Sequence, residues 1–178
     1  MFDPTAFDNM KVVIEGALYD LDLAGEIVIT DRNDIVNMAK MSRGFDVHFQ
    51  LPEAKGNIIS AKMEIKSDMI NLAAELVPDL VSKRQSGCKL RLQFFHKDIT
   101  DEKQLKEINW ILTEIWGDTR KICQSVTITP SKSLISNCIS IEFDRLIGED
   151  QMNDLVELID FMITTIQHLQ AYLIEVSN

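Results

Sequence analysis

The last thirty residues of the chain carry the pattern that most restricts its fold. From Gly148 onward, apolar residues recur every three or four positions, as they do along one side of an α-helix. They are Met152, Leu155, Ile159, Met162, Ile166, Leu169, Leu173 and Val176. This spacing predicts one long helix, about 40 Å from end to end at roughly 1.5 Å per residue. More apolar residues flank the row, so the stripe is wide enough to lie on a sheet.

A second pattern, the alternation of apolar and polar residues, predicts β-strands at five places. These segments are residues 45–51, 59–66, 89–94, 125–129 and 135–143. In each of them one face is polar, which is typical of antiparallel sheets that are covered on one side only. We therefore predict a two-layer α+β fold, with a mainly antiparallel sheet, helices packed on one of its faces and a long C-terminal helix.

Shorter helices are predicted between these strands. Apolar residues at helical spacing place one over residues 68–80, after a Ser67 cap, and another over residues 101–116. Earlier in the chain, the short β-branched run at residues 27–29 is expected to form a strand. A short helix that Asp31 caps and Gly44 ends is then expected to follow it.

Residues 3–23 fit two patterns. Most of the segment has apolar residues at helical spacing, whereas residues 19–23 alternate as a strand does. Asp3 before Pro4 is a favourable helix start, so we expect a helix that runs to about Leu18.

The chain is predicted to form a single domain over residues 1–178. Within it, residues 26–84 and 88–178 both follow the predicted order strand, helix, strand, strand, helix. No residue motif is repeated between them and their spacings differ, so an internal two-fold repeat is a hypothesis that rests on element order alone.

Charge and cysteine content restrict the classes of function. The net charge of −10 argues against nonspecific binding to nucleic acid or to an anionic membrane, which requires a basic surface. The three cysteines form no CxxC pair and the N-terminus lacks a signal-peptide pattern, so we expect a soluble protein of the reducing cytoplasm. The most apolar window, residues 155–174, contains charged residues and is not expected to span a membrane.

Motifs of catalysis or metal binding are weak. His48, His96 and His168 are scattered, without a cysteine or carboxylate at metal-ligand spacing, so we expect no metal, no cofactor and no catalytic residue. Asp20 and Asp22 form an Asp-x-Asp that resembles the nucleophile motif of haloacid-dehalogenase-type phosphatases. That resemblance implies an attacking carboxylate, an acid–base carboxylate and magnesium. It covers about five residues, and Leu-Ala follows where the family usually has Gly-Thr.

The polar face of the predicted sheet is one candidate functional surface. Its candidate ligand-binding residues are His48, Lys62, Lys89, Arg91 and Cys138. Lys89 and Arg91 belong to a basic segment, residues 83–91, that could hold an anion. Cys138 is the thiol that we expect to be most open to reaction. The aromatic residues fall on the inward face, which argues against the stacking of RNA bases.

The helices offer a second candidate surface, because some of their apolar residues lie outside the buried stripe. These candidate interface residues are Trp110, Val156, Phe161, Ile163, Tyr172 and Ile174. We therefore expect a protein-association or regulatory module that forms a homodimer or binds another protein through its helices. The alternative is a small-ligand-binding or catalytic domain that uses the polar face of the sheet.

Overall fold

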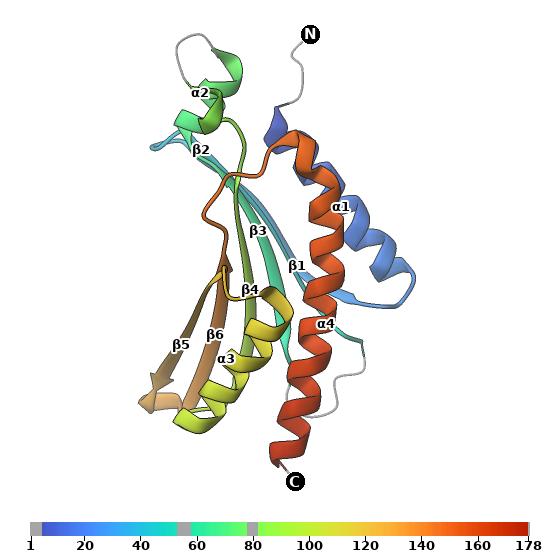
Figure 1. Ribbon diagram of the computed structural model, residues 1–178, viewed down its shortest axis with the longest axis vertical. Coiled ribbons are helices and arrows are strands. Elements are labelled where there is room, and N and C mark those ends of the chain that lie inside the picture. The colour runs from blue at the N-terminus through green and yellow to red at the C-terminus, as the bar shows by residue number, and fades with distance from the viewer. Residues whose placement is uncertain (1–4, 53–57, 78–81, 178) are drawn as a thin grey trace.

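The computed structural model describes residues 5–52, 58–77 and 82–177, in which helices lie on one side of a six-stranded sheet (Figure 1). The helices are α1 (Ala6–Leu23), α2 (Met69–Leu76), α3 (Glu102–Trp116) and α4 (Met152–Ser177). The strands are β1 (Val28–Asn37), β2 (Ser42–Gln50), β3 (Ser60–Ser67), β4 (Lys89–Lys97), β5 (Lys121–Thr129) and β6 (Leu134–Glu142). Neighbouring strands are antiparallel throughout the order β1-β2-β3-β4-β6-β5, so the predicted α+β fold is confirmed.

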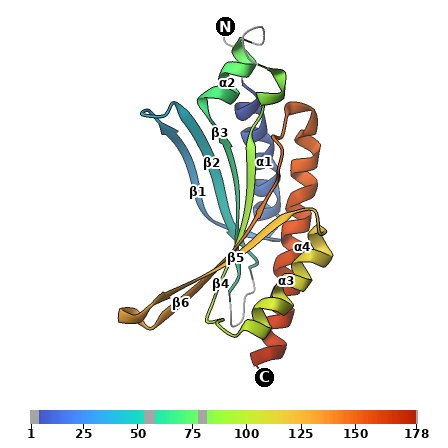
Figure 2. The same cartoon turned by 60° about the vertical axis from the view of Figure 1, so that its left-hand side comes forward.

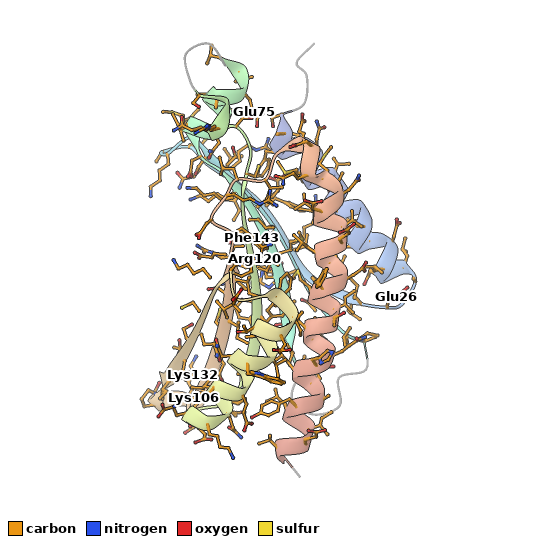
Figure 3. The ribbon with its side chains drawn as sticks, in the orientation of Figure 1. Glu26, Glu75, Lys106, Arg120, Lys132 and Phe143 are labelled. Carbon is orange, nitrogen blue, oxygen red and sulfur yellow. The ribbon has the colours of Figure 1, made fainter. Side chains whose placement is uncertain are left out.

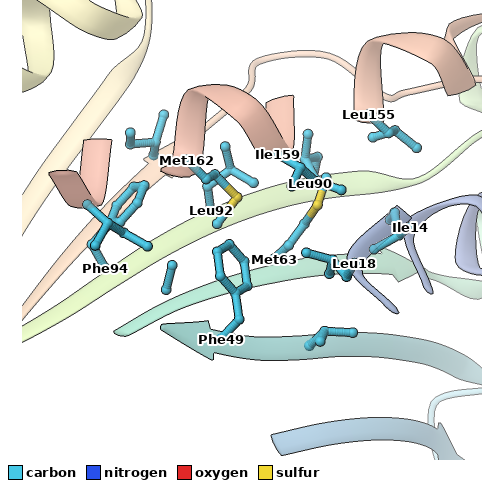
Figure 4. Packing of buried hydrophobic residues seen from close by; sticks show 14 of the residues in the cluster. Ile14, Leu18, Phe49, Met63, Leu90, Leu92, Phe94, Leu155, Ile159 and Met162 are labelled. Atoms are coloured by element: carbon cyan, nitrogen blue, oxygen red, sulfur yellow. The ribbon is translucent and has the colours of Figure 1, made fainter. Parts of the chain in front are cut away.

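The sheet has one covered face and one open face. Helices α1, α3 and α4 lie along the covered face, and Figure 2 shows the opposite side of the sheet without a helix. On the covered face, Phe49, Met63 and Phe94 come from three adjacent strands, and each is at most 1% exposed. They pack beneath buried residues of α1 and α4 such as Leu18 and Met162 (Figure 4). This apolar layer is the core of the fold.

The long C-terminal helix is confirmed as one continuous element. Helix α4 follows a 3₁₀ turn at Glu149–Gln151, and its apolar row is buried from Leu155 to Leu173 at 4% exposure or less. Its first half lies beside α1, so both helices bury their apolar stripes against each other as well as against the sheet (Figure 1).

Helix α1 is longer than the sequence predicted. Thr5 caps it in a capping box with Asp8, and it runs to Leu23 instead of ending near Leu18. The strand-like alternation of residues 19–23 was therefore misleading, because Leu18 and Leu21 still face the core at helical spacing. The proposed start at Asp3-Pro4 lies outside the described residues.

The prediction of a helix between Asp31 and Gly44 is wrong. These residues form the end of β1, a turn and the start of β2, with Ile35 paired to Gly44 and Asn37 to Ser42. Ile35 is 55% exposed, so the apolar residues that suggested a helical face have nothing to pack against. Pairing with β2 satisfies the backbone instead. The element order that suggested an internal repeat is therefore absent, and the repeat is unconfirmed.

Two smaller findings complete the fold. The N-cap of α2 is Asp68, one residue after the expected Ser67, and the helix ends at Leu76, while residues 78–80 of the expected helix lie outside the described residues. Among the described residues, no helix combines the length and the apolar content needed to cross a bilayer.

Candidate functional site

The open face of the sheet carries a row of cross-strand charge pairs. Arg91 on β4 lies between Glu64 on β3 and Glu142 on β6 in the strand register. Its guanidinium is 3.0 Å from the Glu142 carboxylate and 3.8 Å from that of Glu64. Lys121 on the edge strand β5 reaches Glu142 at 3.7 Å. These pairs are partly exposed and each stabilises the sheet only modestly, in the way expected of cross-strand pairs.

One end of the open face is hollowed into a cavity of about 630 Å³. It lies between the β1–β2 hairpin and residues 143–146, which follow β6, and its floor is formed by β3 and β4. Gly44 lines this cavity, and no heavy atom beyond its chain neighbours lies within 4 Å of the position that a Cβ atom would occupy there. At another wall, the Arg120 guanidinium lies 4.6 Å from the centre of the Phe143 ring (Figure 3).

The lining of this cavity is more basic than the chain as a whole. Six of its lining residues are basic and three are acidic, although the chain has a net charge of −10. The basic residues are Lys40, Arg43, Lys66, Lys89, Arg91 and Arg145. Several of them have a carboxylate partner: the Arg43 guanidinium lies 2.6 Å from Asp8 of α1, and that of Arg145 lies 4.0 Å from Asp154.

Two lysines converge at the rim of the cavity. Lys89 and Lys66 reach the carboxylate of Asp68 at 2.6 Å and 3.4 Å. The hydrogen bond from Lys89, together with the charge of both lysines, holds the pKa of Asp68 below its usual value. Asp68 therefore stays ionised and neutralises one of the two lysines.

The cavity contains only some of the residues that the sequence indicated. Lys89 and Arg91 line it, whereas His48, Lys62 and Cys138 lie elsewhere on the open face. Lys40 and Arg145 were missed, because they lie in loops that no strand alternation places on a face of the sheet.

The prediction that the aromatic residues lie on the inward face is wrong for Phe95. It lies on the open face, beside buried Phe94, and its ring stacks on that of His48 with centroids 6.1 Å apart. His48 in turn is 3.2 Å from Asp46. This is a local packing arrangement away from the cavity.

The accessible thiol is Cys123 instead of Cys138. Cys138 is half-buried next to Gln93, and burial raises its pKa; Cys88 is fully buried, and burial raises its pKa to about 12. Cys123 lies exposed on the edge strand β5. Because the thiolate is the reactive form, we expect iodoacetamide at neutral pH to alkylate Cys123 at least about ten times faster than the other two. Mass spectrometry of timed digests measures this, and faster labelling of Cys138 would contradict it.

The buried histidine predicts a pH dependence of stability. His96 is 3% exposed, and burial lowers the pKa of its imidazole below the ordinary value of 6.5. The unfolded chain therefore takes up a proton at a higher pH than the folded one, so folding stability is lost as pH falls from 6.5 through the folded pKa. We expect His96→Phe to reduce the loss of stability between pH 7 and about pH 5. His168→Phe, at an exposed position, is the control, and equal pH profiles for the two variants would contradict the prediction.

The Asp20–Asp22 pair does not have the strand-end setting of the phosphatase motif. Both residues lie in the last turns of α1, and Asp22 accepts a hydrogen bond from the backbone N–H of Ile29 at 3.0 Å. Asp22 therefore joins the end of α1 to β1. Within the described residues, no group of three or more metal-ligating side chains is close enough to hold an ion.

The helical interface candidates differ in exposure. Trp110 is 65% exposed, Ile174 53%, Phe161 47% and Val156 40%, whereas Ile163 and Tyr172 pack partly buried against the core. The Tyr172 hydroxyl donates to Glu107 of α3 at 2.5 Å. Val156 and Ile174 are separated by about 27 Å along α4, so the set does not form one compact patch.

No protein-family model, curated protein or solved structure matches this chain. The function is therefore inferred from its own residues.

Proposed function

We propose that this protein is a non-catalytic association module, which binds a second polypeptide chain through exposed apolar residues of its helical layer. The partner is a second copy of the chain or a different protein. The buried core does not include Trp110, Val156, Phe161 or Ile174.

Trp110 is the observation that carries the proposal. Helix α3 contains two tryptophans with different environments. Trp116 is 8% exposed, packs against the Phe161 ring and donates its indole N–H to Thr165 at 3.0 Å. Trp110 is 65% exposed. An exposed tryptophan is a typical anchor of protein interfaces, because its large ring contributes much apolar area for little conformational entropy.

Light scattering and the fluorescence of Trp110 test the proposal together. In a Trp116→Phe background Trp110 is the only indole, since the chain has two tryptophans. We expect its emission to shift to the blue as protein concentration, or a candidate partner, is raised, and Trp110→Ser to weaken association about tenfold or more. A strict monomer at high concentration, with Trp110 fully open to a soluble quencher, would contradict the self-associating form.

A second candidate function is the binding of an anionic small ligand in the cavity of the open face. The excess of cations around this cavity, in an acidic chain, favours it. Calorimetric titration with inorganic phosphate and with citrate tests it. We expect Lys66→Gln with Lys89→Gln to weaken binding at least about tenfold, and Lys103→Gln on the outside of α3 to leave it unchanged. No heat of binding for either anion would exclude this function for those ligand classes.

A further inference from the structure

The two edges of the sheet differ in how they are protected against pairing. Strand β1, at one edge, carries three charged residues, Asp31, Arg32 and Asp34, and a bulge between Ile29 and Asp31. Asp34 and Arg32 also form ion pairs with Lys11 and Glu15 of α1. Charges and bulges are the devices by which natural sheets prevent an edge from adding another strand.

Strand β5, at the other edge, has none of these devices beyond its first residue. After Lys121, the sequence Ile-Cys-Gln-Ser-Val-Thr-Ile-Thr has no charge, proline or glycine, in a chain of which 26% is charged. Its pairing with β6 runs without a register shift over nine residues. Six of the nine residues are exposed, including Ile128 at 61%. A long, regular and uncharged edge of β-branched residues is a template for strand addition.

We propose that two copies of this chain associate by antiparallel pairing of their β5 edges into one continuous sheet. The inference goes beyond the proposed helical association, because it names a second copy of the chain as the partner and the β5 edge as a separate contact. In the register centred on Ser125, all nine residues of β5 pair with their counterparts. Ile122 then lies opposite Ile128 of the other copy, and Cys123 lies opposite Thr127.

This register is chemically self-complementary. Apolar Ile122 and Ile128 meet on the covered side of the sheet, where Val126 and Ile128 are exposed in the single chain. Small polar residues meet on the open side, and Lys121 lies opposite Thr129, so no like charges are brought together. The outward N–H and C=O groups of β5 gain partners without exposing or burying a charge.

The rest of the fold leaves room for this contact. The β5–β6 hairpin extends away from α1 and α4 (Figure 2). Helix α3 lies along β5, where Gln124 donates its side-chain amide to the Leu105 carbonyl at 2.8 Å. The two-fold axis of an antiparallel β5 pair is perpendicular to the sheet, so the α3 helices of both copies lie on the same side of the joined sheet.

Sedimentation velocity tests the pairing with charge variants on the two edges. Val126→Lys with Ile128→Lys introduces four cations into the proposed dimer, and we expect the dimer dissociation constant to rise about 100-fold. Ile35→Lys with Val36→Lys is the matched control on β1, where both residues are 55% exposed. It should leave the dissociation constant unchanged. Equal weakening by both variants, or a monomeric parent protein, would overturn the proposal.

Cross-linking tests the register. Directly opposite residues in an antiparallel pair have Cα atoms about 4.5–5.5 Å apart, within disulfide range. Cys138 lies directly opposite Ser125 in the same chain, so it is replaced together with Cys123. In a Cys123→Ser, Cys138→Ser background, Ser125→Cys should therefore give a covalent dimer on mild oxidation, and Thr30→Cys at the bulge of β1 should not. If Trp110→Ser abolishes a dimer that the β5 variants leave intact, the helical association stands and edge pairing is wrong.

Discussion

Replacing Phe94 by alanine is expected to lower the free energy of unfolding by about 3–5 kcal/mol. The Phe94 side chain is fully buried on the covered face of β4, beneath Met162 of α4 (Figure 4). Removing it takes apolar area out of the core and leaves a cavity that the surrounding strands and helix fill only in part.

The adjacent residue supplies the control for this prediction. Phe95 is on the same strand but on the open face, where it stacks on His48. Phe95→Ala is expected to cost about 1 kcal/mol, because the site remains open to water. Urea denaturation followed by circular dichroism measures both variants. Equal losses would mean that the two faces of the sheet are equally packed, contrary to a fold with one covered face.

The second large effect is expected at Asn137 on β6. This residue is 3% exposed, and its side chain bridges both backbone groups of Ile99, donating to the C=O at 2.8 Å and accepting from the N–H at 3.2 Å. Asn137→Ala leaves two buried backbone groups without partners. We expect a loss of about 2–4 kcal/mol in the free energy of unfolding.

An exposed asparagine serves for comparison. Asn153 lies exposed in the first turn of α4, and Asn153→Ala is expected to change stability by no more than about 0.5 kcal/mol. The same denaturation experiment applies to both variants. If Asn137→Ala costs as little as Asn153→Ala, the bridge to Ile99 does not hold the loop before α3.

The sequence predicted the elements whose residues are buried on one side. The periodic spacing of apolar residues reflects which face of an element is buried. The helices α3 and α4 and the strands β2, β3, β4 and β6 could therefore be located from it. It failed between Asp31 and Gly44, where most residues of the hairpin are exposed and the spacing of its apolar residues does not follow burial. It also gave the end of α1 as Leu18, because residues 19–23 happen to alternate.

The candidate surfaces were predictable only where a strand carries them. The alternation of β4 placed Lys89 and Arg91 on the open face, and both residues line the cavity there. The cavity itself is formed by the β1–β2 hairpin and residues 143–146, whose meeting depends on strand order. The exposure of Cys123 likewise depends on β5 being the last strand, which no local pattern in the sequence reveals.

Amide hydrogen exchange measured by mass spectrometry, at low and at high protein concentration, tests most directly whether this protein associates through an edge of its sheet. Outward N–H groups of a free edge exchange rapidly, whereas those paired with a second strand are protected. Association through β5 predicts that peptides from Lys121–Thr129 exchange more slowly at high concentration, while those from Val28–Asn37 do not change. Identical exchange of β5 at both concentrations, or new protection at β1, would contradict it.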